Sequence, residues 1–368
     1  MHVASAGEYL QVKSLISIFV EKKINVFITV TSISGYNWLK RENNNNIVFD
    51  FLPLDFSWNA KKIIKLIQPS ILIFVKTDIW PGFLREAKKN NIPRVLVSAP
   101  ARRPVSGLKK SYYKFLYENF TAVFPVTDEG KLYYKNILEK STPVEVAGDG
   151  KYDIVFDRKK ERSISLSAVT KTDICALLGS VWPEDLNVII NPVLKAMEQY
   201  PDLKIIVAPH ENDRRHVDAL VNLFAKFKPA LFSDLKVPNP SREISLKLNF
   251  RVLIVDTIGD LFFLYENSHI AYVGGGFSTG IHNILEPCAM KNAVIFGPRY
   301  QKFPEAEKIL EINAACSISN TAGFESVFLD LLANKKKRLE KAKACYDFVS
   351  QHKGASQKLF KAVQKIIS

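Results

Sequence analysis

Residues 271–299, AYVGGGFSTGIHNILEPCAMKNAVIFGPR, join an apolar strand, a glycine loop and a helical segment. The apolar run meets three glycines at 274–276, and the spacing then predicts a helix over 281–291. Glycines let the backbone approach a ligand closely, and the N–H groups at a helix start favour an anion. Asn283 and Glu286 share one face of that helix. The stretch predicts a nucleotide pocket at a sheet edge; the alternative is a tight turn before a capped helix.

The length of 368 residues suits two domains of roughly 150–200 residues each. The hydrophobic content of 47% indicates a globular protein, and no apolar run approaches the roughly 20 residues that span a bilayer. The formal net charge of +14 indicates an anionic partner: nucleic acid, a phosphorylated substrate or an acidic membrane surface. No signal peptide precedes the first strand, which starts so abruptly that we expect the natural chain to begin upstream.

Metal and redox signals are absent from the sequence. The cysteines show no Cys-x-x-Cys spacing, which argues against a zinc site or a disulfide framework and favours a reducing compartment. No His-Glu-x-x-His or Asp-x-Asp cluster is present, so we expect no metal. The glycine loop lacks the Walker A pattern, and no Gly-x-Gly-x-x-Gly follows the first strand. These absences argue against a P-loop NTPase and a dinucleotide-binding domain.

Apolar runs alternate with helical segments in both halves of the chain, which predicts two doubly wound parallel sheets. Strands are expected at 2–5, 25–30, 47–52, 71–75, 94–98, 122–126 and 144–147, and then at 173–178, 203–208, 251–255, 270–273 and 293–296.

The domain boundaries follow from this alternation. We expect an N-terminal domain over 1–150, a polar linker over 151–172 and a second domain over 173–345. A C-terminal helix over 346–368 is expected to pack back on the first domain. A helix over 327–345 carries a lysine run, which we interpret as a solvated helix face.

Polar residues follow several of these strands. Glu8 stands between the first strand and a helix start, and the run KTDIWP at 76–81 follows another strand. Open α/β sheets bind their ligands at the carboxyl ends of their strands, so we expect these residues to face a ligand. The alternative for Glu8 is an interaction with the helix dipole.

Nine blocks of the sequence together resemble the 3-deoxy-D-manno-octulosonic acid (Kdo) transferases of lipid A assembly, in the order of that family. They cover most of the chain and are HVASAGE at 2–8, FLPLDFSWN at 51–59, FVKTDIWP at 74–81, VAGDGKYD at 146–153, LGSVWPED at 178–185, IVAPHE at 206–211, VDTIGDLFFLY at 255–265, YVGGGFSTGIHNILEPCAM at 272–290 and FGPRYQKF at 296–303.

The resemblance implies the GT-B glycosyltransferase fold, in which two Rossmann-like domains face one another across a cleft. It implies an inverting transfer of Kdo from CMP-Kdo to a lipid A precursor, lipid IVA, in lipopolysaccharide core biosynthesis. The first domain would bind this acceptor and the second would bind CMP-Kdo. No cofactor and no nucleic acid partner are expected. The enzyme would act at the cytoplasmic side of the bacterial inner membrane, peripherally or through an N-terminal segment missing from this sequence.

The resemblance also implies site residues. Glu8 matches the glutamate proposed as the general base. Lys13, Asp78 and Arg102 match positions suited to the acidic acceptor. The positions that match the donor blocks are Ser180, Pro209, His210, Glu211, Gly259, Gly275, Gly276, His282, Asn283 and Glu286. Glu286 would bind the ribose hydroxyl groups, and backbone N–H groups near Asn283 would bind the phosphate. No metal is required, because the leaving nucleotide departs already charged.

The sequence departs from the family in four places. Lys76 stands where many members have a glutamate, and Asp78 is one methylene shorter than the residue it replaces. His210-Glu211 replaces a commoner arginine-histidine pair. The hydrophobic N-terminal anchor is absent. We therefore expect membrane contact on a basic and apolar face that would consist of Ile16, Phe19, Lys109, Tyr112 and Tyr113.

Two other functions are compatible with the residues alone. A GT-B enzyme that acts on a UDP-sugar, a glycosyltransferase or an epimerase, would share the fold, since fold does not fix function. A diphosphate donor calls for further basic groups near the glycine loop, where only Arg299 stands. A non-enzymatic nucleic-acid or membrane-binding protein would fit the charge, and its binding would fall steeply with salt.

Overall fold

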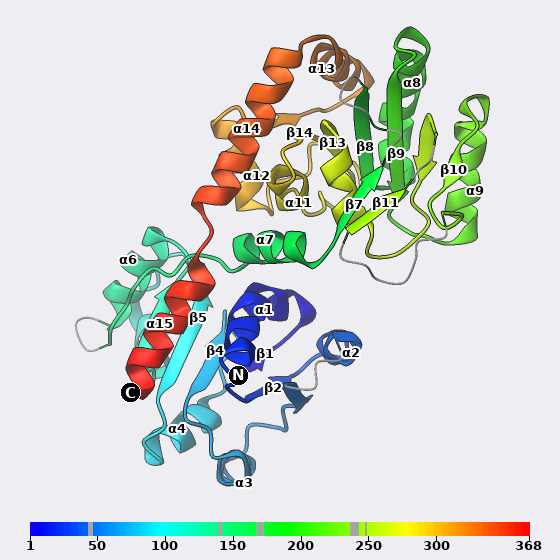
Figure 1. Cartoon of the computed structure of the whole chain (residues 1–368). Helices are drawn as coiled ribbons and strands as arrows, with labels where there is room; N and C mark the ends of the chain where they lie inside the picture. The colour runs from blue at the N-terminus through cyan, green and yellow to red at the C-terminus, as the bar shows by residue number, and fades with distance from the viewer. Residues whose placement is uncertain (43–46, 139–141, 167–168, 170–172, 236–242, 247–248) are drawn as a thin grey trace. The chain divides into compact units, whose positions relative to one another are not determined.

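The computed structural model describes residues 1–368 except 43–46, 139–141, 167–168, 170–172, 236–242 and 247–248 (Figure 1). The chain forms two compact units. The first contains Met1–Ile154 together with His352–Ser368, and the second contains Val155–Gln351.

The first unit is built on a six-stranded sheet in the order β3-β2-β1-β4-β5-β6, and every pairing is parallel. Its strands are β1 His2–Val3, β2 Val26–Val30, β3 Ile47–Phe51, β4 Leu72–Val75, β5 Arg94–Ala99 and β6 Ala122–Pro125. Its helices are α1 Ala6–Glu21, α2 Ile33–Glu42, α3 Ser57–Ile67, α4 Pro81–Lys89, α5 Gly107–Tyr117, α6 Asp128–Leu138 and α15 Ala355–Ile367. The strand order reverses between β1 and β4, which is where such sheets bind ligands.

The last helix of the chain completes the core of the first unit. Leu359, Phe360 and Val363 of α15 are buried in one cluster with α1 and the strands, and Phe19 lies 5.7 Å from Phe360 between ring centroids. Asp153 accepts hydrogen bonds from the N–H groups of Gly354 (2.5 Å) and Ser356 (2.7 Å) at the start of α15. These contacts tie the end of the chain to the first unit.

The second unit contains a seven-stranded parallel sheet in the order β10-β12-β9-β8-β13-β14-β15. Its strands are β8 Ile174–Val181, β9 Leu203–Pro209, β10 Ala230–Leu231, β12 Val252–Ile254, β13 Ile270–Val273, β14 Ala293–Phe296 and β15 Cys316–Ser317. Its helices are α8 Pro183–Gln199, α9 Arg214–Leu223, α10 Leu261–Leu264, α11 Leu285–Ala289, α12 Pro304–Glu311, α13 Thr321–Ala333 and α14 Lys335–Gln351, with short 3₁₀ turns at Ala225–Phe227 and Tyr265–Asn267. Here the order reverses between β8 and β13.

The stretch expected to be a linker is regular structure. Helix α7 covers Lys151–Glu161, and strand β7, Ser163–Leu166, pairs in parallel with β11, Glu243–Leu246. The polar composition that predicted a linker belongs to α7 and to the residue after it, where Arg158 and Arg162 bind acidic residues of the second unit. The rest of the expected linker lies mostly outside the described residues.

Two predicted helices have other bounds. The helix expected over 281–291 is reduced to α11, because the preceding residues fold back on the glycine loop, where His282 donates its N–H to the carbonyl of Gly274 (3.1 Å). The helix expected over 327–345 is two helices, α13 and α14. Asn334 separates them and caps α14 by accepting the N–H of Lys337 (3.0 Å).

Candidate functional site

The first candidate site lies where β1 and β4 end in the first unit. Ser5 caps α1, and Glu8 occupies the third position of that helix. Glu8 Oε2 accepts the N–H of Ala4 at 2.7 Å, and the residue is 8% exposed. The sequence therefore places a carboxylate at the point where a doubly wound sheet binds its ligand.

The electrostatics of this edge favour a proton acceptor. Burial raises the pKa of Glu8 above its usual value, opposed by the hydrogen bond from Ala4 and the charge of Lys76, while Asp78 adds to the rise. A carboxyl group with a raised pKa is a stronger base once ionised, as proton abstraction near neutral pH requires. Lys76 itself has a φ of 59°, uncommon for a lysine, and such backbones concentrate at functional sites.

Asp78 belongs to a hydrogen-bonded group at the same edge. His2 Nε2 lies 3.0 Å from Asp78 Oδ2, Thr31 donates its hydroxyl to that oxygen at 3.3 Å, and Trp80 Nε1 lies 3.2 Å from His2 Nε2. The hydrogen bond from His2 lowers the pKa of Asp78 more than burial raises it. Asp78 is thus a fixed negative charge near Glu8, and the sequence did not indicate the role of His2.

The other predicted acceptor residues lie further away in the first unit. Arg102 follows β5, two strands from β1, and its Nη1 donates to the hydroxyl of Tyr113 at 3.1 Å. Lys13 is half-buried on α1. The structure groups Glu8, Asp78 and Lys76, whereas Arg102 belongs to a tyrosine-rich cluster.

The second candidate site lies where β8 and β13 end in the second unit. Asp185, in the first turn of α8, is fully buried. Its Oδ1 accepts the hydroxyl of Tyr272 (2.8 Å), and its Oδ2 accepts the N–H groups of Gly275 (2.7 Å) and Trp182 (2.9 Å). Asp185 was not among the residues predicted from the sequence; its place three residues after Trp182, at a strand-to-helix turn, was the available signal.

The glycines of the loop make close backbone contacts within the protein that the sequence did not predict. A Cβ on Gly276 would lie 2.5 Å from the Cα of Gly297, and one on Gly274 would lie 2.2 Å from the carbonyl oxygen of Ser180. Gly275 has a φ of 89° and donates its N–H to Asp185. The glycines allow close approach of backbone to backbone, and the N–H of Gly275 is already used. The expectation that N–H groups near Asn283 bind a phosphate concerns the following helix start and stays a prediction.

Three rings stack beside the glycine loop. The ring centroids of Trp182 and His210 are 4.2 Å apart, and those of His210 and His282 are 4.5 Å apart. Trp182 Nε1 donates to His282 Nε2 at 3.0 Å. Burial and then His210 lower the pKa of His282. The neutral ring therefore carries its proton on Nδ1, where it is a donor.

Glu286 is held by a residue from the predicted linker. Arg158 Nη1 donates to Glu286 Oε1 at 2.7 Å. Burial raises the pKa of Glu286, and the charge of Arg158 and a hydrogen bond with Asn283 oppose the rise. Asn283 Oδ1 also accepts the N–H of Leu285 at 3.0 Å and so shapes the turn before α11. The spacing of the residues predicted that Asn283 and Glu286 lie together, but nothing in the sequence pointed to Arg158.

The remaining predicted donor residues follow strands of the same sheet. Ser180, with a φ of 52°, is the second-last residue of β8. Pro209 ends β9 and Glu211 follows it, while Gly259, with a φ of 95°, follows β12. Parallel strands thus bring these residues to one edge of the second unit.

One group in the described part of the chain has metal-binding geometry, although the sequence predicted no metal. Glu211, Asp213 and His216 each bring a ligand atom within 4.8 Å of the others. Asp213 caps α9 by accepting the N–H of His216 (3.0 Å), and its second oxygen lies 2.8 Å from His216 Nδ1. The capping of α9 by Asp213 therefore explains why these side chains lie close together.

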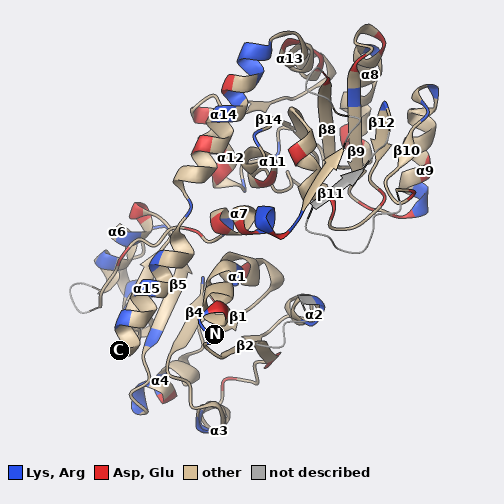
Figure 2. Ribbon diagram, in the orientation of Figure 1, with Lys and Arg blue, Asp and Glu red and all other residues tan. Residues whose placement is uncertain are grey.

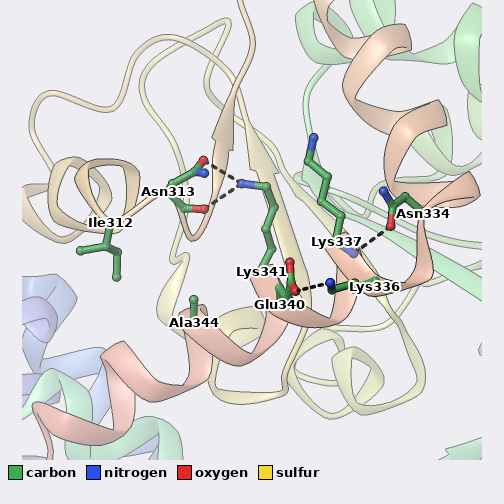
Figure 3. A pocket seen from close by; sticks show the side chains of 8 residues that line it. All are labelled: Ile312, Asn313, Asn334, Lys336, Lys337, Glu340, Lys341 and Ala344. Atoms are coloured by element: carbon green, nitrogen blue, oxygen red, sulfur yellow. Dashed lines mark hydrogen bonds and ion pairs between the residues drawn. The ribbon is translucent and has the colours of Figure 1, made fainter.

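A hollow of about 520 Å³ lies at another edge of the second unit, and Figure 3 shows its lining. Lys341 donates to the carbonyl oxygen of Asn313 at 2.8 Å, and Lys336 lies 4.0 Å from Glu340. Asn313 precedes β15, so the hollow lies at the amino end of that strand, opposite the donor edge. Figure 2 shows basic residues on α14, and two lysines of its lysine run, Lys336 and Lys337, form ion pairs with Glu340 and Asp330.

Comparison with known proteins agrees with the sequence resemblance. Residues 1–154 match the family model described as 3-deoxy-D-manno-octulosonic-acid transferase (kdotransferase). The 3-deoxy-D-manno-octulosonic acid transferase of Haemophilus influenzae is 26% identical and aligns over 98% of this chain and 84% of its own length. The enzyme of the same name from Chlamydia trachomatis is 28% identical over 100% of this chain and 85% of its own. The chain is a relative of the Kdo transferases.

The relationship to Kdo transferases identifies the chain as a glycosyltransferase. The family match contains Glu8, Lys13, Asp78 and Arg102, and the alignments with relatives extend through the second unit.

Solved structures show the GT-B fold. The UDP-GlcNAc 2-epimerase of Neisseria meningitidis is 14% identical, with a TM-score of 0.64 over 99% of this chain and 98% of its own. MurG of Acinetobacter baumannii is 14% identical, with a TM-score of 0.58 over 99% of this chain and 98% of its own. The predicted fold class is confirmed.

Proposed function

We propose that this protein transfers Kdo from CMP-Kdo to a lipid A precursor, lipid IVA, with inversion at the anomeric carbon. The observation that carries the proposal is Glu8, a carboxyl group of raised pKa at the reversal point of the first sheet, in a region that matches the Kdo transferase family. The full-length similarity to named Kdo transferases supports the donor sugar.

Glu8 would act as the general base. The carboxylate takes the proton from an acceptor hydroxyl as the hydroxyl oxygen bonds to the anomeric carbon of Kdo. The bond from that carbon to the phosphate oxygen breaks, and CMP leaves with the bonding electron pair. Lys76 and Asp78 would set the charge around Glu8, and Lys13 and Arg102 supply positive charge for an acidic acceptor.

The donor half of the reaction would use the second unit. The carboxylate of Glu286 would accept hydrogen bonds from the ribose hydroxyl groups, and the N–H groups near Asn283 would bind the phosphate. His210 and His282, stacked with Trp182, offer ring faces and a neutral N–H to the nucleotide. Ser180, Pro209, Glu211, Gly259 and Gly276 would shape the same edge.

Part of the membrane face predicted from the sequence is wrong. Ile16 and Phe19 are 1% and 5% exposed, in a core cluster that includes residues of α15, whereas Lys109 and Tyr112 of that face are exposed. No helix in the described residues is long and apolar enough to cross a membrane.

A mixed apolar and basic surface instead lies on and before α3, and we name it the α3 surface. Its residues are Leu54, Phe56, Trp58, Lys61, Lys62, Lys65 and Leu66, all exposed. Asp55, in the same loop, accepts the N–H groups of Gly82 (2.7 Å) and Phe83 (3.0 Å), which joins this surface to the segment that follows Asp78. Aromatic and lysine side chains suit a membrane interface.

We propose that the α3 surface meets the membrane that holds the acceptor. Flotation with vesicles that contain anionic lipid tests it: Trp58→Ala with Leu66→Ala is expected to reduce the bound fraction, whereas Leu132→Ala, an exposed leucine on α6, is not. Equal binding by all variants would contradict this placement.

The function is tested by incubating the protein with labelled Kdo, a CMP-Kdo generating system and lipid IVA. We expect a Kdo-bearing lipid and release of CMP. Parallel reactions replace CMP-Kdo by UDP-sugars. Turnover of a UDP-sugar without Kdo transfer would contradict the proposal and favour the other GT-B chemistry.

A further inference from the structure

Arg158 lies on α7, the helix in which the chain passes from the first unit to the second. It contacts Glu286, the predicted ribose-binding carboxylate. Its guanidinium carbon lies 4.3 Å from the ring centroid of Phe262 and 5.8 Å from that of Phe263, while Nη1 donates to Glu286 Oε1. Both side chains of the ion pair are largely buried, with exposures of 27% for Arg158 and 18% for Glu286. The ring fixes the plane of the guanidinium, and the guanidinium fixes one oxygen of the carboxylate.

The contact with Arg158 also affects whether Glu286 is ionised. An ionised carboxylate only accepts hydrogen bonds, which suits the two hydroxyl groups of a ribose, whereas a protonated carboxyl group also donates. Burial favours the protonated form of Glu286, and Arg158 is the first influence against it.

The other groups around Glu286 do not replace this charge. Tyr265, from the 3₁₀ turn, faces it as a neutral phenol whose pKa burial raises, and Asn283 is uncharged. On α14, the thiol of Cys345 shares a hydrogen bond with that of Cys288, and both cysteines are free. The strand β14 that packs on α11 is wholly apolar.

We propose that Arg158 is a positioning residue of the donor site, which holds Glu286 charged and oriented toward a ribose so that the protein prefers CMP over 2′-deoxy-CMP. The inference rests on the proposed function, because it takes a cytidine nucleotide as the donor's leaving group. It assigns the preference for a ribonucleotide to a residue of α7 that lies outside the predicted donor blocks.

Calorimetric titration of the full chain with CMP and with 2′-deoxy-CMP tests the inference. In Arg158→Met, CMP binding is expected to weaken about tenfold while 2′-deoxy-CMP binding changes little, so the preference between the two nucleotides disappears. The acid limb of CMP binding shifts to higher pH, because Glu286 without its partner is protonated more easily. Arg158→Lys keeps the charge and is expected to retain part of the preference and the original acid limb. In transfer assays with Arg158→Met, KM for CMP-Kdo is expected to rise by a larger factor than kcat falls.

Arg251→Met is the matched control. This arginine also lies over a ring, 5.0 Å from the centroid of Phe227, and donates to the carbonyl oxygen of Met197 (2.6 Å), but at the amino end of β12. Its loss is expected to leave the preference for CMP unchanged. If Arg158→Met loses affinity equally for both nucleotides, or keeps the preference for CMP, the role of Arg158 is overturned while the proposed function stands. If Arg158→Met does not fold, Arg158→Lys with wild-type preference and KM would overturn it. No binding of CMP by the unaltered protein would overturn the proposed function and this inference together.

Discussion

Glu8 and Asp185 occupy equivalent places in the two parallel sheets, each beside the point where the strand order reverses, yet their surroundings differ. Each is the third residue of the helix that follows the first strand of its sheet. Glu8 accepts one backbone N–H, close to Lys76 and Asp78, whereas Asp185 is fully buried and accepts three hydrogen bonds from its own unit.

The difference separates the carboxylate that we propose as the general base from one that binds groups of its own unit. Three donors bind Asp185 and fix the glycine loop to α8, so we expect no ligand to bind this carboxylate. Glu8 is held in place by Ala4, while burial makes its charged form costly. The helix position alone does not decide between these roles; the number of donors and the nearby charges do.

Glu8→Gln gives the largest expected effect on this comparison. Glutamine keeps the shape and can accept the N–H of Ala4, but it cannot take a proton, so the rate of Kdo transfer should fall by about 10²–10⁴-fold. Because burial raises the pKa of Glu8, the folded state is favoured at low pH and loses that advantage as pH rises through the folded pKa. The thermal midpoint of Glu8→Gln at neutral pH should therefore not fall. Glu86→Gln, a buried glutamate of α4, should retain activity. Full activity in Glu8→Gln would remove Glu8 from the mechanism.

Asp185→Ala should have the second largest effect, on stability. It leaves the N–H groups of Gly275 and Trp182 and the hydroxyl of Tyr272 without their acceptor, which should cost roughly 2–4 kcal/mol in the free energy of unfolding. Asp185→Asn should cost much less, because its amide oxygen can serve both N–H groups and its NH₂ can donate to the tyrosine. Chemical denaturation measures both. If the amide is as damaging as alanine, the charge of Asp185 has a role beyond these bonds.

Replacing a glycine by alanine should also change stability differently near Asp185 and near Glu8. Gly276→Ala places a Cβ 2.5 Å from the backbone of Gly297 and should destabilise the second unit by about 1–3 kcal/mol. A Cβ on Gly7, beside Glu8, meets nothing closer than 3.9 Å, and alanine is the better helix former, so Gly7→Ala should stabilise the protein by up to about 1 kcal/mol. Thermal unfolding compares the two variants. A destabilised Gly7→Ala would show that the first edge is packed as tightly as the second.

The sequence was informative where a pattern is local. Buried parallel strands appear as apolar runs, and their carboxyl ends fall on one edge, which is why Glu8, Lys76 and Asp78 could be expected together. Contacts between distant segments were missed. Arg158 looked like part of a polar linker because Glu286 is 128 positions away in the chain. Phe19 looked available to a membrane because its cover, α15, comes at the end of the chain.

The helix start after the glycine loop shows a second limit. The spacing of Asn283 and Glu286 fits a helix, but the N–H of His282 bonds instead to Gly274 and delays α11 to Leu285. Helix periodicity could not reveal this competing backbone bond.

The smallest expected effect concerns the charges that distinguish the Glu8 edge. Lys76 lowers the pKa of Glu8 and Asp78 raises it, so removing each charge should move the pH dependence of transfer in opposite directions. The base must be ionised, and activity is therefore lost on the acid side as pH falls through its pKa. In Lys76→Met the acid limb of kcat/KM should move to higher pH, and in Asp78→Asn to lower pH. Measuring both profiles separates this field effect from general damage, which would lower the rate without moving the limbs apart. Limbs that stay at the wild-type position in both variants would mean that a group other than Glu8 controls the acid side, and the contrast between the two carboxylates would then rest on hydrogen bonding alone.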